Sequence, residues 1–160
     1  MAKNLIAYFS ASGVTKKVSE NLAKVLDADI YEIKPVKPYT DADLNWMDTN
    51  SRSSIEMKDW KSRPEIVNDN AQIEKYDNIF LGFPIWWYIA PTIINTFLEK
   101  YNFANKKIIL FATSGGSGFG STIENIKPSV SDSAKITEGK ILNHNPNTND
   151  LKDWVDSLNL

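Results

Sequence analysis

The chain has 160 residues with 18 basic and 20 acidic side chains, a net charge of -2 and a sequence pI near 5.4. This length fits one domain, residues 1–160, with a sizeable core and no room for a second. The absence of cysteine excludes disulfides, iron–sulfur clusters and thiol catalysis, and a single histidine, His144, argues against a zinc site. Nothing in this charge balance indicates a nucleic-acid partner, which would normally show a basic patch or stripe.

The N-terminal residues do not resemble a secretory signal, and no apolar run approaches the roughly 18 residues of a membrane span. We therefore expect a cytoplasmic protein with neither a membrane nor a nucleic-acid partner.

The stretch Tyr8–Thr15 joins an apolar run at 5–9, which predicts a strand, to a helical pattern over 14–26. That pattern places apolar residues on one helix face at Val14, Val18, Leu22, Val25 and Leu26. The turn would direct helix N-terminal amides and the hydroxyls of Ser10, Ser12 and Thr15 to one spot, which favours an anion. The alternative is that the hydroxyls only cap the helix.

A second strand is predicted at 29–33, and a long polar segment with weak periodicity follows at about 36–68. This 36–68 segment has the character of an insertion and contains Trp46, Met47, Met57 and Trp60. Connections of this length are usually functional or mobile. The two tryptophans predict packing against the segment's own domain, or else against a ligand or another subunit.

The rest of the chain alternates predicted strands and helices. These are a short helix at 71–76, a strand at 78–83, a helix from Pro91 to about 101, a strand at 108–113, a helix at 121–126, a weak strand at 134–142 interrupted at Gly139, and an amphipathic helix at 151–158. Such alternation predicts an α/β fold with a mostly parallel sheet covered on both faces. In these sheets, ligands bind outside the carboxyl ends of the strands.

Three predicted strands end in unusual loops, at 10–15, 84–88 and 114–120, which we expect to converge on one site. The second loop carries Trp86, Trp87 and Tyr88, and three adjacent aromatic residues cannot all face the core. The third has four glycines in six residues, so its backbone can lie against a planar ligand. A phosphorylated heteroaromatic ligand suits all three loops, and flavin mononucleotide (FMN) fits.

The chain resembles the flavodoxin family. Ser10-Ala11-Ser12-Gly13-Val14-Thr15 is similar to that family's T-x-T-G-x-T phosphate loop, with serine at the first two hydroxyl positions. Gly82–Trp87 and Thr113–Gly118 resemble the bacterial flavodoxin-like branch. The resemblance implies a three-layer sandwich with helices on both faces of a five-stranded parallel sheet of order 2-1-3-4-5.

The resemblance also implies a division of the cofactor-binding residues. The FMN phosphate would lie at Ser10, Ser12, Gly13, Val14 and Thr15. The isoalloxazine ring would be lined by Pro84, Ile85, Trp86, Trp87 and Tyr88, one of whose aromatic rings would stack on it. The pyrimidine edge of the ring would bond to Ser114, Gly115, Gly116, Ser117 and Gly118. The flavin carries the chemistry, so no catalytic side chain is assigned.

Two departures from the family bear on function. Residues 84–90 contain no glycine, so the peptide turnover that many flavodoxins use beside the flavin is harder here. The charge of -2 also gives little steering toward basic protein partners. Both favour an FMN-dependent oxidoreductase that passes electrons from NAD(P)H to a quinone or other small acceptor. The alternative is a one-electron carrier that serves protein partners.

Two further readings fit less well. A dinucleotide fingerprint at Gly116, Gly118 and Ser121 lacks its final glycine, and a serine-hydrolase pattern breaks at Phe119. Trp46 and Trp60 are predicted to lie in a segment that covers the flavin edge or forms a homodimer contact.

Overall fold

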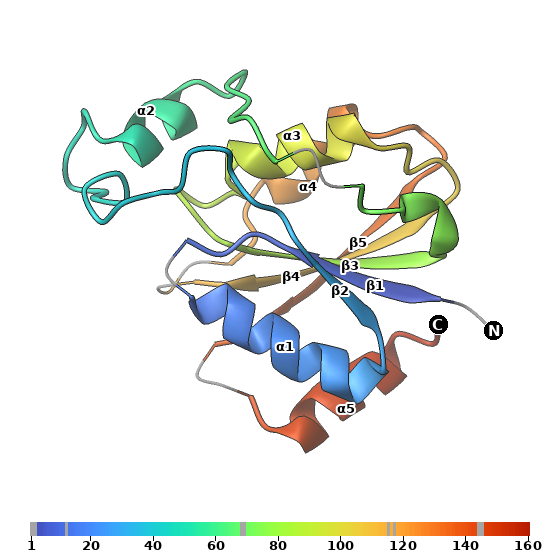
Figure 1. Cartoon of the computed structure of the whole chain (residues 1–160). Coiled ribbons are helices and arrows are strands. Elements are labelled where there is room, and N and C mark those ends of the chain that lie inside the picture. Colours follow the sequence, from blue (N-terminus) through green and yellow to red (C-terminus); the bar gives the residue numbers. More distant parts are fainter. Residues whose placement is uncertain (1–2, 12, 68–69, 115, 117, 144–145) are drawn as a thin grey trace.

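Five parallel strands form one sheet in the computed structural model (Figure 1), which describes residues 3–11, 13–67, 70–114, 116, 118–143 and 146–160. The strands are β1 (Asn4–Tyr8), β2 (Asp29–Glu32), β3 (Asn78–Pro84), β4 (Lys107–Thr113) and β5 (Lys135–Ile141). Their order is β2-β1-β3-β4-β5, and each neighbouring pair is parallel. The predicted sheet order is confirmed.

Helices cover both faces of this sheet (Figure 1). One face carries α1 (Val14–Leu26) and α5 (Thr148–Ser157), and the other carries α3 (Thr92–Lys100) and α4 (Thr122–Ile126). Two short 3₁₀ turns, η1 (Ile73–Lys75) and η2 (Lys127–Ser129), complete the connections. The three-layer sandwich predicted from the resemblance is therefore confirmed.

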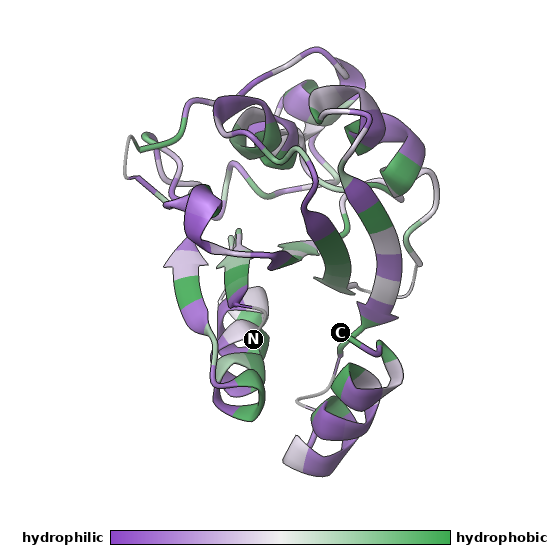
Figure 2. Ribbon diagram, turned by 90° about the vertical axis from the view of Figure 1, so that its right-hand side faces the viewer, coloured by the Kyte–Doolittle hydropathy of each residue, from purple (hydrophilic) through white to green (hydrophobic). Residues whose placement is uncertain are grey.

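Each face of the sheet has its own apolar core. In β1, Ile6 faces a cluster that includes Leu22 of α1 and Trp154 of α5. Its neighbours Leu5 and Ala7 face the larger cluster beneath α3. This split follows from the two-residue period of a strand, and β3 and β4 are apolar in near-continuous runs because both of their faces are covered. Figure 2 shows the mixture of hydrophobic and hydrophilic residues along the helices, which bury only one side.

Two details differ from the predicted pattern. Val14 is 53% exposed, so the prediction that it lies on the buried face of the first helix is wrong. Gly139 does not interrupt the last strand but forms a bulge, where Ile109 pairs with Thr137 and Phe111 with Lys140. A Cβ on Gly139 would lie 1.9 Å from the Leu110 carbonyl oxygen, so glycine is needed for this close approach.

The 36–68 segment contains a helix that the sequence did not predict, α2 (Arg52–Lys58), which lies away from the sheet (Figure 1). Its N-cap Ser51 accepts a hydrogen bond from the Ser54 backbone N–H at 3.4 Å. The helix buries Ser53 and Ser54. Because its buried residues are serines, α2 has no apolar periodicity to detect.

Both tryptophans of this segment are exposed: Trp46 is 70% and Trp60 is 66% accessible. The prediction that they pack against their own domain is wrong. Within the described ranges, none of the helices is long and apolar enough to cross a membrane.

Candidate functional site

The three predicted loops meet at the carboxyl edge of β1, β3 and β4, which are neighbours in the sheet. A pocket of about 600 Å³ is lined by Leu44, Trp46, Ser53, Ile85, Trp86, Trp87, Tyr88 and Gly116. A smaller pocket of about 290 Å³ shares Ile85 and Trp86 with it and is otherwise lined by Val14, Pro84, Thr113, Ser114 and Asn143. The second and third loops line these two adjoining pockets, and the first loop contributes Val14 to the smaller one.

In the first loop, the hydroxyls shape the backbone. Ser10 Oγ accepts a hydrogen bond from the Gly13 N–H at 3.1 Å, and Gly13 has a φ of 94°, which favours glycine. The Oγ1 atoms of Thr15 and Thr113 lie 2.8 Å apart and share a hydrogen bond in a buried position. Ser10 and Thr15 therefore do not act as simple helix caps. They stabilise the chain just before and at the start of α1, and the first amides of a helix lack partners within it, which suits an anion.

The second loop forms a tight turn with an unusual backbone. The Trp86 N–H donates to the Ile89 carbonyl at 2.9 Å, and the Ile89 N–H returns a bond at 3.2 Å. Between them Trp87 and Tyr88 have φ values of 49° and 68°. Two left-handed residues in succession define a type I′ turn, which normally uses asparagine and glycine. Bulky aromatic residues at such positions are strained, and strain of this kind clusters at functional sites.

Gly120, at the end of the third loop, lies against this turn. A Cβ added to Gly120 would be 2.2 Å from the Tyr88 carbonyl oxygen, and Gly120 itself has a φ of 54°. This close approach of Gly120 to the Tyr88 carbonyl restricts the position of the 86–89 turn. The sequence pointed to the loop but did not single out this glycine.

The three adjacent aromatic side chains have different surroundings, as expected. The Trp86 ring packs edge-on against Phe9 and Tyr39, with centroids 5.7 and 5.4 Å apart. Trp87 is 43% and Tyr88 69% exposed. Trp86 therefore joins the sheet to the 36–68 segment, while the other two aromatic residues lie at the pocket rim. Burial, together with a hydrogen bond to Glu56, raises the pKa of Tyr39, so its hydroxyl remains a donor.

The third loop is held by a residue that the sequence analysis missed, Asn143. The Ser114 N–H donates to Asn143 Oδ1 at 2.9 Å, and Asn143 Nδ2 donates back to the Ser114 carbonyl at 2.7 Å. The Gly116 N–H donates to Ser114 Oγ at 3.2 Å, and Gly118 is exposed. Its position in the sequence could have indicated this role. Asn143 follows the last strand, and the carboxyl end of that strand lies at the same edge of the sheet as the three loops.

Four residues named from the sequence lie outside the described residues. They are Ser12, Gly115, Ser117 and His144.

Part of the pocket wall comes from the 36–68 segment, through Leu44, Trp46 and Ser53. A position of Trp46 at the flavin edge was one of the alternatives drawn from the sequence, the other being a dimer contact; Leu44 and Ser53 were missed. Arg52 holds this wall: its guanidinium lies 3.8 Å from the Tyr39 ring centroid and donates to Glu56 at 2.9 Å and to the Lys37 carbonyl at 2.6 Å. A cation over an aromatic ring adds to the ion pair.

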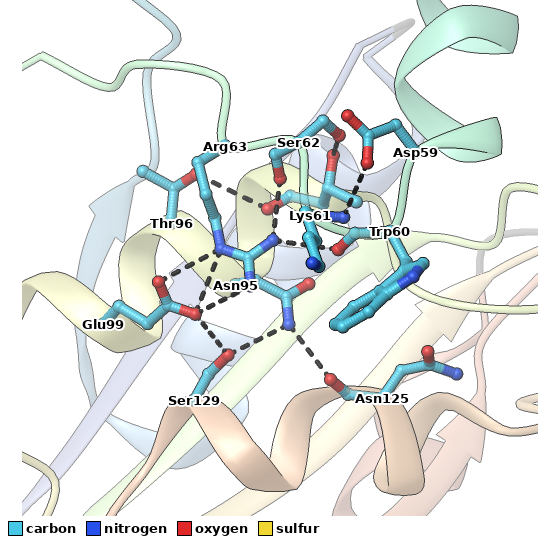
Figure 3. A network of polar contacts seen from close by, with 11 residues as sticks. Asp59, Trp60, Lys61, Ser62, Arg63, Asn95, Thr96, Glu99, Asn125 and Ser129 are labelled. Carbon is cyan, nitrogen blue, oxygen red and sulfur yellow. Dashed lines mark hydrogen bonds and ion pairs between the residues drawn. The ribbon is translucent and has the colours of Figure 1, made fainter.

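The far end of the segment is attached to α3 by the polar network of Figure 3. Arg63 donates through Nε to both Glu99 oxygens, at 3.1 and 3.0 Å, and its Nη2 lies 2.9 Å from Oε2. Ser129 donates to the same carboxylate at 2.7 Å. The hydrogen bond from Arg63, reinforced by Ser129, lowers the pKa of Glu99. The exposed Trp60 lies beside this network, over a separate hollow of about 160 Å³.

Solved structures resemble this chain along its whole length. A Bacteroides eggerthii protein assigned as a flavoprotein is 41% identical with a TM-score of 0.92, and the match covers 100% of this chain and 99% of that one. A Bacteroides uniformis protein with the same assignment is 42% identical with a TM-score of 0.89, over 97% and 98% of the two chains. A Lactobacillus acidophilus flavoprotein solved in complex with FMN is 26% identical with a TM-score of 0.72, over 97% and 99%.

Among curated proteins, rat NAD(P)H dehydrogenase [quinone] 1 is 30% identical over a stretch covering 41% of this chain and 30% of that protein. The chain thus matches less than a third of the length of this relative. The flavodoxin family model matches residues 3–158. Together with the sheet order, this match over nearly the whole chain shows that the protein belongs to the flavodoxin family.

Proposed function

We propose that this chain is an FMN-dependent oxidoreductase that passes electrons from NAD(P)H to a quinone or another small acceptor. The cofactor is FMN: the flavodoxin family and the FMN complex of the Lactobacillus acidophilus flavoprotein both support the cofactor predicted from the sequence. When bound, the flavin supplies the electron-transfer chemistry, and the protein binds, orients and shields it.

The two adjoining pockets suit the two ends of FMN. The larger has room for a flat ring and is lined by aromatic and aliphatic side chains. The smaller begins at Val14, beside the first amides of α1, where a phosphate is favoured. No lysine or arginine occurs at 10–15, so amides and hydroxyls would hold the phosphate.

The residues we assign to FMN are those predicted from the sequence. The phosphate is assigned to Ser10, Ser12, Gly13, Val14 and Thr15; the ring to Pro84, Ile85, Trp86, Trp87 and Tyr88; and the pyrimidine edge to Ser114, Gly115, Gly116, Ser117 and Gly118. We add Asn143, which orients the Ser114 backbone through two hydrogen bonds.

The observation that supports an oxidoreductase over a carrier is the double wall of the larger pocket. Trp87 and Tyr88 line it from the sheet edge, and Trp46 lines it from the 36–68 segment. An open pocket lined from both directions offers space for a small molecule beside the cofactor. The partial similarity to the rat quinone dehydrogenase supports the same donor and acceptor classes.

Reconstitution with FMN tests this function. The FMN-loaded protein is expected to oxidise NADH or NADPH continuously when 1,4-benzoquinone is present, and the protein without FMN serves as the control. FMN binding without any nicotinamide oxidation would contradict the oxidoreductase proposal.

The second candidate is an electron carrier for protein partners. The exposed aromatic residues at the pocket rim favour it, because exposed aromatic groups often mark contact surfaces. Rapid reduction of FMN by a reductase protein, with no turnover of small quinones, would support the carrier.

We further propose that the chain forms a single domain at 1–160 with an insertion at about 36–68, that it is cytoplasmic, and that it forms a homodimer in which this segment contributes to the contact. Sedimentation at high protein concentration tests the dimer.

A further inference from the structure

Ser53 carries a polar group without a structural role in the pocket wall. The residue is 2% exposed, and its Oγ is buried and makes no hydrogen bond within the described part of the chain. A buried hydroxyl without a partner destabilises a fold, and buried polar groups in proteins are nearly always paired. An orphaned hydroxyl beside a pocket therefore points to a ligand.

The neighbouring serine hydroxyls at the start of α2, those of Ser51 and Ser54, are paired. Ser51 Oγ donates to Ser54 Oγ at 2.9 Å and accepts from the Ser54 N–H. The backbone N–H of Ser53 donates to the Asp43 carbonyl at 2.9 Å, which fixes the position of the residue. The Ser53 hydroxyl is thus not needed to begin or to cap the helix.

The chemistry around Ser53 defines the class of ligand. Leu44 and Trp46 share its wall, and the eight residues that line the pocket are all uncharged. The Trp46 indole is 70% exposed, so it has a large apolar face available for contact. A neutral, flat, aromatic molecule suits these surfaces, and an oxygen acceptor on that molecule suits the hydroxyl.

We propose that Leu44, Trp46 and Ser53 form a subsite for a neutral, planar aromatic carbonyl compound, with the Ser53 hydroxyl donating to its carbonyl oxygen. The inference rests on the proposed function, since it assigns the opposite wall, at 85–88, to the flavin. It deepens that function by identifying which residues select the electron acceptor.

The subsite is held in place before any ligand binds. Arg52 joins α2 to the start of the segment through the Tyr39 ring and the Lys37 carbonyl, and it pairs with Glu56 within α2. Arg63 fixes the other end to Glu99 (Figure 3). A preformed wall reduces the ordering cost of binding.

The test is a calorimetric titration of 1,4-naphthoquinone into the oxidised, FMN-loaded protein without an electron donor, so that binding is measured without turnover. Ser53→Ala is expected to weaken naphthoquinone binding about tenfold, the effect of one hydrogen bond, and to leave FMN affinity unchanged. Ser54→Ala is the matched control, because it removes a buried hydroxyl one residue along that does not line the pocket.

A second pair of variants tests the apolar part of the subsite. Trp46→Leu is expected to weaken naphthoquinone binding. Trp60→Leu removes a similarly exposed tryptophan from the same segment, but over the separate hollow, and should leave binding unchanged. Both side chains are on the surface, so neither change should prevent folding.

Thermal unfolding of the ligand-free protein gives a further readout. Ser53→Ala should unfold at the same temperature as the wild type or higher, because it removes an unpaired buried group. A lower unfolding midpoint would overturn the proposal by showing that the Ser53 hydroxyl has a structural role.

The proposal is also overturned if wild-type protein does not bind naphthoquinone, if Ser53→Ala weakens FMN binding instead, or if neither Ser53→Ala nor Trp46→Leu alters naphthoquinone affinity. Failure of the wild type to bind FMN would instead refute the proposed function.

Discussion

The two walls of the large pocket are built in different ways. The wall at the sheet edge depends on buried contacts: Thr15 and Thr113, which share a hydrogen bond, are 2% and 5% exposed. The wall from the 36–68 segment depends on two ion pairs: the Arg52 and Glu56 side chains are 18% and 14% exposed, and the Arg63 and Glu99 side chains, at the far end of the segment, are 32% and 42% exposed. Solvent screens the outer pair, Arg63–Glu99, so it contributes less than a buried bond.

This difference teaches which parts of the site tolerate change. The sheet-edge wall is coupled to the core, so substitutions there should affect stability and cofactor binding together. The segment wall contacts the core through Tyr39 but presents exposed residues such as Trp46 to the pocket, so substitutions of those exposed residues should alter ligand selection and leave the fold intact. Each of the following predictions tests that contrast.

The largest effect is expected at Gly120. Gly120→Ala would place a Cβ 2.2 Å from the Tyr88 carbonyl oxygen at a φ of 54°. The combined left-handed strain and overlap should cost about 2–4 kcal/mol of unfolding free energy. Urea unfolding measures the loss, and an FMN titration should show weaker binding because the turn moves.

Gly118→Ala is the control for the loss of unfolding free energy; it is not used in the FMN titration, because Gly118 is itself assigned to FMN. Gly118 lies in the same loop, and a Cβ there meets no atom within 4 Å. Equal losses in the two variants would show that the Gly120 contact does not position the turn.

A smaller effect is expected from the buried threonine pair. Thr15→Val leaves the Thr113 hydroxyl buried without its partner, which should cost about 1–3 kcal/mol of unfolding free energy and weaken FMN binding. The double variant Thr15→Val/Thr113→Val should recover much of the stability, since no hydroxyl is then unpaired. A double-variant loss equal to the sum of the single losses would contradict the coupling between the two loops.

The strained turn should show a gain in stability at the expense of function. Tyr88→Gly relieves a left-handed residue, and after the entropy cost of glycine the gain should be about 0.5–1 kcal/mol. FMN binding should weaken because an aromatic wall residue is lost. Chemical unfolding and an FMN titration measure the two effects.

Asn105→Gly, at another left-handed residue, is the control that should leave FMN binding unchanged. A Tyr88→Gly protein that is less stable than the wild type would show that the turn is not strained.

The smallest effect is expected at the Arg63–Glu99 ion pair, which attaches the far end of the 36–68 segment to α3. The lowered pKa of Glu99 arises first from the Arg63 hydrogen bond, so the folded state favours the carboxylate. The ionised Glu99 side chain therefore adds to the free energy of unfolding above the ordinary glutamate pKa of about 4.3, and this stabilisation is lost as the pH falls through the lowered pKa. Because the Arg63–Glu99 pair is partly exposed, the loss of unfolding free energy should stay below about 1 kcal/mol. The Trp60 carbonyl accepts a hydrogen bond from Arg63 at 3.0 Å. The fluorescence of Trp60 should therefore change when Arg63 is released from Glu99 in acid.

In Glu99→Gln this acid transition in fluorescence should disappear. An unchanged transition would show that a group other than Glu99 causes it.

The comparison of prediction with structure shows where sequence patterns are informative. The apolar runs at 78–83 and 108–113 gave the central strands to within one residue, because strands buried on both faces must be apolar throughout. The short helix α2 was missed because its buried residues are serines. Asn143 was missed because its role depends on a backbone group 29 residues away.

The sequence by itself determined the alternation of strands and helices, the flavodoxin resemblance and the three loops at the strand ends, because periodicity, glycines and prolines act locally. Only the tertiary structure decided that the 36–68 segment turns Leu44, Trp46 and Ser53 into a pocket wall and leaves both of its tryptophans exposed. The physical reason is that Arg52 bonds to Lys37, 15 residues away within the segment, and Arg63 bonds to Glu99, 36 residues away in α3, and no local pattern encodes such pairs.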